Sequence, residues 1–345
     1  MSEKQAKYPN DVVISSRVRL ARNYQDIPFP TMMNDVWAAE SVRRTTDAVA
    51  SVEDAGDYRL VRLAETPPVD RQALIERHLI SRDLNQRSDI SAALIRKDDR
   101  VSIMVNEEDH LRIQALMPGD QLETAARMAR EMDDRIERSV QYAFDEQLGY
   151  LTACPTNTGS GMRASEMLHL PALTMGGQMG SVGQSVAKLG LTIRGLYGEG
   201  SEALGNLYQV SNQITLGRTE QEIVETLSAV SKQLTDLERK QRRAIQEQDA
   251  VGLEDQLMRS VGVFAHARRM GTKEFTQRWS DVRFAAAMRL VAIPLERLDR
   301  LLYEAQPACV IQSAGRDLTA QQRDQARAEL IREACRNAKD EQDDS

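Results

Sequence analysis

The spacing of apolar residues along the chain changes twice and divides it into three stretches. In the first, helical spacing predicts helices over residues 34–52, 67–78 and 120–144. Short apolar and β-branched runs predict strands over residues 60–63, 92–95, 101–105 and 111–116, and residues 11–14 form a further apolar run. This mixture of helices and strands is typical of an α/β (α+β) domain.

The middle stretch is rich in glycine. Residues 149–217 hold 13 of the 19 glycines, and they separate strand candidates at residues 150–153, 191–193 and 207–210. Glycine lets a backbone turn sharply and approach a ligand closely, so we expect binding loops in this stretch.

The last stretch is helical. Thr219 and Glu222 have the spacing of a capping box, which predicts a helix start. Helical patterns then continue to residue 337, with interruptions near Gly271, Pro294 and Pro307. We expect a mixed domain over residues 11–241, a helical C-terminal domain over residues 242–338, and a frayed acidic tail over residues 339–345.

Composition excludes several classes of protein. The 345 residues carry a formal net charge of −7, which argues against a general nucleic-acid-binding surface. The polar residues 1–10 form no secretory signal, and no apolar run is long enough to span a membrane. Cys154, Cys309 and Cys335 are too few and too widely spaced for a disulfide framework or a cysteine-rich zinc site. A cytoplasmic protein is expected.

Arginine is unusually frequent, with 37 arginines against 8 lysines. Codon bias and exposed helix faces are one explanation, and guanidinium forks that bind phosphate are another. Arg17 and Arg19 would share one face of an extended segment, where they repel each other unless an anion lies between them. The alternative is a pair of solvated surface arginines.

An acidic cluster follows the predicted strand at residues 101–105. Glu107, Glu108 and Asp109 come directly after it, and Arg112 lies close behind. A carboxylate here would bind a cationic substrate or act as a base, and Arg112 would meet phosphate. The alternative is a solvated turn.

Two glycine-rich segments carry further candidates. Cys154 ends a predicted strand and precedes a loop that resembles a phosphate cradle, although it lacks the Gly-Lys-Ser/Thr of a P-loop. The alternative is a buried structural cysteine. Arg194 and Glu199 flank a second glycine-rich segment, which would bring the Glu199 carboxylate to a site. The alternative is an ordinary turn. With Arg163, these residues suggest an ATP-dependent phosphoryl transferase that acts on a cationic acceptor.

These same segments resemble a known family. Residues 106–112 (NEEDHLR) and 154–157 (CPTN) are similar to signatures of the phosphagen (guanidino) kinases. Residues 149–157, 163–165 and 194–206 resemble more closely the bacterial protein-arginine kinases, with Ser160 where many relatives have threonine. The resemblance covers residues 10–338 and implies a mainly antiparallel sheet flanked by helices. The chain begins close to the first arginine motif, so we expect no separate helical N-terminal domain.

The resemblance also implies roles for individual residues. Glu108 and Glu199 would grip the acceptor guanidinium, with Glu107 as the alternative to Glu108, and Cys154 would lie near the reactive nitrogen. No protein ligand is expected for Mg²⁺, which ATP would mainly hold. The implied ATP-binding residues are Ser15, Ser16, Arg17, Val18, Arg19, His78, Arg112, Arg163, Ala164, Ser165, Glu166, Met167, Arg194, Gly195, Leu196, Tyr197, Gly198 and Glu199.

A motif in the last stretch implies a second site. Arg323, Asp324, Arg327 and Ala328 resemble the Arg-Asp-x-x-Arg-Ala motif of the protein-arginine kinases, which implies an allosteric phosphoarginine pocket and a homodimer. The alternative is a solvated helix face.

The family resemblance implies a kinase that phosphorylates arginine in proteins. The implied partners are unfolded proteins, a heat-shock repressor, a ClpC-type protease and a zinc-finger activator protein. The alternatives are a kinase for free arginine or another small guanidine, and a phosphoarginine-binding pseudokinase adaptor. The presence of Glu108, Cys154 and Glu199 favours an enzyme.

Overall fold

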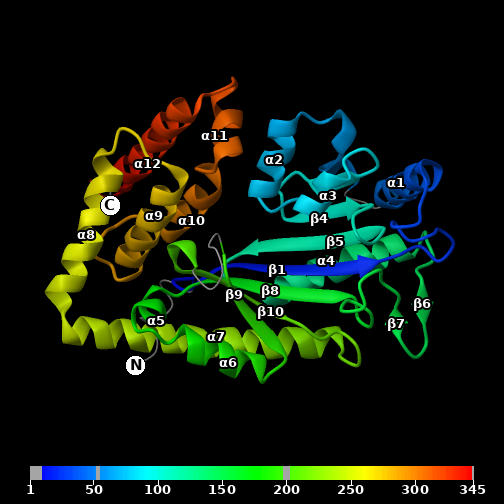
Figure 1. The fold of residues 1–345 in the computed structure, drawn as a ribbon, viewed down its shortest axis with the longest axis horizontal. Coiled ribbons are helices and arrows are strands. Elements are labelled where there is room, and N and C mark those ends of the chain that lie inside the picture. The colour runs from blue at the N-terminus through cyan, green and yellow to red at the C-terminus, as the bar shows by residue number, and fades with distance from the viewer. Residues whose placement is uncertain (1–9, 52–54, 197–202, 344–345) are drawn as a thin grey trace.

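An eight-stranded antiparallel sheet organises the larger part of the molecule, which the computed structural model describes over residues 10–51, 55–196 and 203–343. The strand order is β2-β3-β4-β5-β1-β8-β10-β9 (Figure 1). Its strands are β1 (Val13–Arg22), β2 (Tyr58–Arg62), β3 (Ala92–Arg96), β4 (Val101–Val105), β5 (Leu111–Pro118), β8 (Met162–His169), β9 (Leu191–Gly195) and β10 (Leu207–Asn212), while β6 (Phe144–Asp145) and β7 (Gly149–Tyr150) form a separate hairpin. The antiparallel sheet confirms the expected fold class.

The two faces of the sheet differ because side chains alternate along each strand. In the central strand β1, Val18 and Leu20 are fully buried on the face that packs against α4 (Leu122–Glu137) and α7 (Glu220–Gln248). Arg17 and Arg19 alternate with them in sequence and therefore point to the other face. The apolar face forms the main core and leaves the polar face for a site.

Local signals explain where several helices begin. The side chain of Asn34 accepts a hydrogen bond from the Trp37 amide at the start of α1, and Thr219 and Glu222 form both bonds of the predicted capping box. The remaining helices are α1 (Asp35–Ala50), α2 (Pro68–Glu76), α3 (Arg82–Gln86), α5 (Pro171–Met175), α6 (Met179–Ala187), α8 (Ala250–His266), α9 (Thr272–Ala287), α10 (Leu295–Glu304), α11 (Pro307–Ala314) and α12 (Ala320–Asp343).

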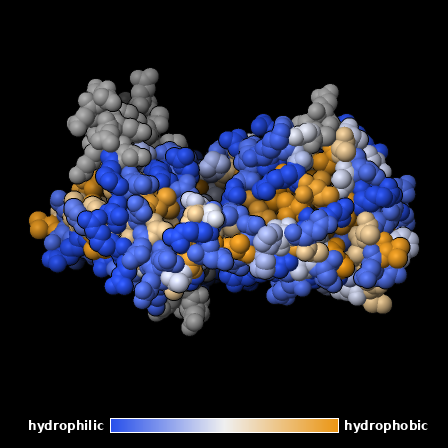
Figure 2. Space-filling view, turned by 90° about the horizontal axis from the view of Figure 1, so that it is seen from above, coloured by the Kyte–Doolittle hydropathy of each residue, from blue (hydrophilic) through white to orange (hydrophobic). Residues whose placement is uncertain are grey.

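The C-terminal helices pack against one end of the sheet. Phe264, Trp279 and Leu298 form a second buried core, and Ile14 and Met167 from the sheet belong to it. Seen from above, the surface narrows between these helices and the part of the molecule that carries α1, α2 and α3 (Figure 1 and Figure 2). None of the helices in the described ranges is long and apolar enough to cross a membrane.

The structure corrects several sequence-based boundaries. The helix predicted over residues 120–144 ends at Glu137, because Tyr142 forms a β-bridge with Tyr24 instead. The strand predicted over residues 150–153 is reduced to β7. Strand β8 was missed because its residues were read as part of a glycine-rich loop, and the short helices α3, α5 and α6 were missed as well.

The last helices also run past expected limits. The division expected after residue 241 falls within α7, which continues to Gln248, and α12 continues to Asp343 through most of the tail that was expected to fray. The interruptions expected near Gly271, Pro294 and Pro307 are confirmed, since these residues lie at the starts of α9, α10 and α11.

Candidate functional site

Register places the candidate arginines on one face of the sheet. Arg19 in β1 lies opposite Arg163 in β8, and Arg112 in β5 lies opposite Ala21, two residues further along β1. Directly opposed residues of an antiparallel pair point to the same side. Arg194 in β9 lies opposite Gln209 in β10, which in turn lies opposite Met167 in β8, so Arg194 points to the same face. The structure thus brings together the five predicted arginines, which are Arg17, Arg19, Arg112, Arg163 and Arg194.

Positive charge is concentrated on this face, and the Glu107 and Glu108 carboxylates pair with one of its arginines, Arg112. Burial and the guanidinium groups of Arg17, Arg112 and Arg163 lower the pKa of Arg19 well below its usual range. Burial and the neighbouring Arg194 and Arg112 lower the pKa of Arg163. Among the described residues, the buried Nε of Arg19 has no hydrogen-bond partner. A polyanion would supply negative charge to this face and an acceptor for this Nε atom.

The arginine face ends in a small cavity that contains the predicted acceptor residues. Glu108 and Cys154 line it together with Arg19, Arg112 and Arg163, and its volume is about 130 Å³. The Nη2 atom of Arg112 donates to a Glu108 carboxylate oxygen at 3.3 Å. Burial and the nearby Asp109 raise the pKa of Glu108. The cavity therefore offers a carboxylate and a thiol beside three guanidinium groups.

The two adjacent glutamates point in different directions. Glu107 is 1% exposed, forms an ion pair with Arg112, and accepts a hydrogen bond from Ser81. The side chain of Glu108 is 42% exposed and lines the cavity. Geometry therefore favours Glu108 as the group that meets an acceptor and gives Glu107 the task of holding Arg112.

A second cavity follows the same strands toward the C-terminal helices. Arg17, His78, Ser165 and Met167 line it, and Arg17 lies two residues before Arg19 in β1. Burial and the charges of Arg17 and Arg19 lower the pKa of His78 to about 4, so its imidazole is neutral at neutral pH. The other lining residues are Ser15, Leu116, Leu196 and Gln209.

Some predicted residues do not reach this face. Ser16 lies opposite Glu166, and both side chains point to the other side of the sheet, where the Ser16 hydroxyl donates to Glu166 at 2.8 Å. Val18 and Ala164 are buried on that side too. Gly195 ends β9. Tyr197, Gly198 and Glu199 lie outside the described residues.

Sequence reasoning missed the residues that position the cavity walls. The Asp109 carboxylate accepts the Ala153 amide at 2.7 Å and the Asn23 side-chain amide at 2.7 Å, which ties the loop before Cys154 to the acidic cluster. The Thr215 hydroxyl lies 2.8 Å from the carbonyl oxygen of Thr156 on the other side of the loop. Asp109 lay within the motif quoted at residues 106–112, whereas no local signal marked Thr215.

The predicted phosphoarginine motif lies on α12. Arg327 is 1% exposed and donates to the carbonyl oxygens of Ala305 and Met270 and to the carboxylate of Asp324, each at 2.7 Å. Ala328 is fully buried. Only Arg323 and Asp324 of this motif have side chains that a ligand can reach.

Comparison with known proteins identifies the family. Residues 40–241 match the model of the ATP:guanido phosphotransferase C-terminal catalytic domain, and residues 250–345 match that of the protein-arginine kinase McsB C-terminal domain. The chain belongs to the protein-arginine kinase family of ATP:guanido phosphotransferases. It is therefore an ATP-dependent phosphotransferase.

Several relatives align with almost the full chain. A protein-arginine kinase of Caldanaerobacter subterraneus is 45% identical over 94% of this chain and 97% of the relative. One of Bacillus subtilis is 43% identical over 99% of this chain and 96% of the relative. Among solved structures, a lombricine kinase is 26% identical, covers 68% of each chain, and superimposes with a TM-score of 0.59.

Proposed function

We propose that this enzyme transfers the γ-phosphoryl group of ATP to the guanidinium groups of arginine side chains in proteins. The observation that carries the proposal is the arrangement along β1, where an arginine-rich face leads directly into a cavity with Glu108 and Cys154. The names of the aligned relatives support arginine in proteins as the acceptor.

The two cavities suggest the direction in which ATP binds. The cavity with neutral His78 and Met167 suits the nucleoside, because apart from Arg17 its walls are apolar or uncharged polar side chains. The phosphates would then follow Arg17, Arg19 and Arg163 toward the acceptor cavity. Bidentate guanidinium groups would hold the phosphoryl group in line and stabilise the charge that develops on its oxygens.

The acceptor cavity supplies what a guanidinium nucleophile needs. The pKa of an arginine guanidinium lies above about 12, so this group is protonated and is a poor nucleophile. Its reacting nitrogen must be oriented and must lose a proton as the N–P bond forms. In our proposal the Glu108 carboxylate orients the guanidinium and takes this proton, while the bond from phosphorus to the leaving ADP oxygen breaks. Cys154 would lie beside the same nitrogen, and Glu199 would be the second carboxylate, as the family resemblance suggests.

We propose that Mg²⁺ accompanies ATP and is held by its phosphates. Within the described ranges, no group of three or more His, Cys, Asp or Glu side chains is placed to hold a metal ion, and the arginine face suits an anion. When bound, the ion would neutralise phosphate charge.

The family resemblance suggests a wider role. We propose that phosphoarginine marks proteins for a ClpC-type protease and regulates a heat-shock repressor, with a zinc-finger protein as a possible activator. Arg323 and Asp324 would form an allosteric phosphoarginine pocket in a homodimer, with Arg327 positioning Asp324. We retain residues 11–241 and 242–338 as the proposed domains.

The test is incubation with Mg-ATP and two acceptors, which are free arginine and an unfolded arginine-containing protein. Acid-labile phosphate on nitrogen, measured by phosphorus NMR and mild-condition mass spectrometry, is expected on the protein. Label on free arginine alone would instead support a small-guanidine kinase. Phosphoarginine binding without any label would support a pseudokinase adaptor.

A further inference from the structure

The end of α2 caps a helix of the C-terminal part. The Glu76 carboxylate accepts hydrogen bonds from the backbone amides of Ala308 and Cys309, at 2.9 and 3.0 Å. These amides lie in the first turn of α11, where a helix leaves its N–H groups without internal partners. Among the described residues, Gln306 at the N-cap position makes no side-chain capping bond, so Glu76 provides this cap from another part of the chain.

Two residues after Glu76, the chain enters the cavity that we assign to the nucleoside. His78 lines that cavity with a φ of 59°, a left-handed conformation in which residues other than glycine are uncommon. Its carbonyl oxygen accepts a hydrogen bond from Gln114 at 2.7 Å. Its ring meets the ring of Tyr303 from α10 edge to face, with centroids 5.6 Å apart.

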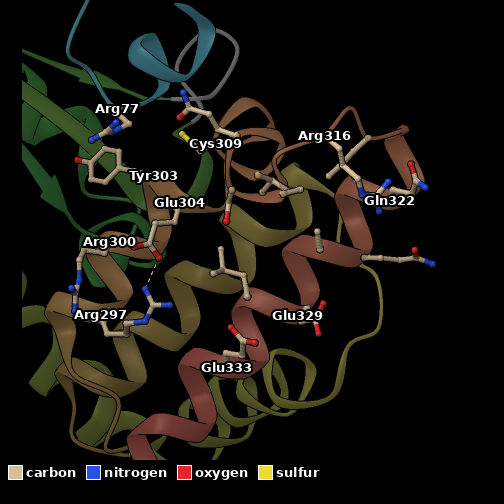
Figure 3. Close-up of a pocket in the computed structure, with 18 of the residues that line it drawn as sticks. Arg77, Arg297, Arg300, Tyr303, Glu304, Cys309, Arg316, Gln322, Glu329 and Glu333 are labelled. Carbon is tan, nitrogen blue, oxygen red and sulfur yellow. Dashed lines mark hydrogen bonds and ion pairs between the residues drawn. The ribbon is translucent and has the colours of Figure 1, made fainter. Parts of the chain in front are cut away.

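The C-terminal helices therefore contact this short segment on two sides. Tyr303 and Cys309 line a large groove with Arg77, the residue between Glu76 and His78, as Figure 3 shows. The Cys309 thiol also lies 3.9 Å from the carbonyl oxygen of Ala73 in α2. A fixed contact at Glu76 restricts the backbone at His78, because only four freely rotating backbone dihedral angles lie between these two residues.

We propose that Glu76 is a positioning residue for the nucleotide: its cap on α11 fixes the segment that presents His78 to the nucleotide cavity. The C-terminal part of the chain thereby sets the affinity for ATP without touching it. This inference rests on the proposed function of the His78 cavity. Its effect belongs to nucleotide binding, since Glu76 lies outside the cavity that holds Glu108 and Cys154.

The test compares three variants by steady-state kinetics and by calorimetric titration with Mg-ATP. In Glu76→Ala the cap is lost, and we expect KM for ATP and the dissociation constant to rise about fivefold while kcat changes little. Glu76→Gln keeps one acceptor oxygen and should restore part of the affinity. Asp70→Ala is the matched control, because it removes the α2–α11 hydrogen bond from Gln312, which is 2.9 Å long and remote from His78.

A double-mutant cycle separates positioning from general stability. If Glu76 acts through His78, then Glu76→Gln should have no further effect on ATP affinity in a His78→Asn background, where asparagine tolerates the left-handed backbone. Unchanged ATP affinity in folded Glu76→Ala, or equal losses in Glu76→Ala and Asp70→Ala, would overturn the proposal. A wild-type chain that binds Mg-ATP but labels no arginine would instead refute the proposed function, and the binding arm would still test Glu76.

Discussion

Arg19 lies among the other positive charges of the site. Its side chain is half-buried beside three other guanidinium groups, and burial and these charges lower its pKa. A protein without a bound anion has no gain from this arrangement, because like charges repel strongly where water is scarce. The arrangement becomes favourable only when phosphate lies between the arginines.

Replacing Arg19 by glutamine should therefore separate stability from function. We expect Arg19→Gln to be as stable as the wild type or more stable without nucleotide, while transition-state stabilisation falls by about 2–4 kcal/mol. Arg19→Lys keeps the charge but loses the planar fork, so it should recover only part of the activity. Thermal unfolding with and without Mg-ATP, together with kcat/KM, measures both effects. A destabilised Arg19→Gln variant with normal activity would contradict this interpretation.

The adjacent glutamates should respond differently to the same change. Glu108→Gln should lower kcat while the free energy of unfolding stays within experimental error, because Glu108 faces a cavity. Glu107→Gln should lower activity and also destabilise the fold by about 1–3 kcal/mol, since Arg112 loses its buried charged partner. Urea unfolding beside steady-state kinetics distinguishes the two. The reverse pattern would assign the acceptor role to Glu107.

At the scale of elements, β8 separates two environments. Arg163 and Ser165 point to the arginine face, whereas Glu166 points into the interior beside Ser16 of β1. Burial raises the pKa of Glu166 to about 7. Its carboxyl group is therefore protonated in the folded chain at pH values where it is ionised in the unfolded chain.

This difference predicts how stability depends on pH. Between about pH 4.5 and 7 the Glu166 carboxyl holds a proton in the folded chain that it has lost in the unfolded chain. Its contribution to the free energy of unfolding is therefore complete below this pH range and is lost as the pH rises through it. The total change is roughly 3 kcal/mol. The free energy of unfolding, measured with urea, should fall between pH 5 and pH 8 by less in Glu166→Gln than in the wild type. Equal losses would show that Glu166 does not titrate in this way.

At the scale of the molecule, the second core joins the C-terminal helices to the sheet. Arg283 in α9 donates to the carbonyl oxygen of Asp11 at 2.8 Å, and the Asp11 carboxylate pairs with Arg239 and Arg242 in α7. Buried pairs of this kind cannot be separated without leaving charges unpaired in the interior. The two parts should therefore unfold together.

The two tryptophans allow this to be measured, because Trp37 lies in α1 and Trp279 in α9. In Trp37→Phe the fluorescence reports only the C-terminal core. Its urea transition should coincide with the transition of the whole chain followed by circular dichroism. A Trp279 transition at clearly lower urea would show that the helical part unfolds on its own.

Sequence reasoning succeeded where local signals determine structure. The capping box at Thr219 and the apolar runs of β3 and β4 are confirmed, because they depend on neighbouring residues alone. The faces of β1 followed from alternation, once the segment was taken as extended. Strand β8 was missed because two glycines precede it, and its pairing with β1 lies 150 residues away in sequence.

The site shows the same division between local and distant information. Motifs identified the arginines, Glu108 and Cys154 as candidates, but only register could bring residues of four strands to one face. Glu107 and Glu108 differ in burial, which adjacent positions in a sequence do not reveal. Thr215 acts through a contact with Thr156, 59 residues away, and no pattern near either residue indicates it.

The most direct test is a crystal structure with Mg-ADP, nitrate and an arginine-containing peptide, in which planar nitrate imitates the transferring phosphoryl group. The account predicts nitrate within hydrogen-bonding distance of Arg19 and Arg163. It also predicts the peptide guanidinium against the Glu108 carboxylate, beside the Cys154 thiol. A guanidinium bound away from Glu108, or a nucleotide whose phosphates do not lie on the arginine face, would contradict it.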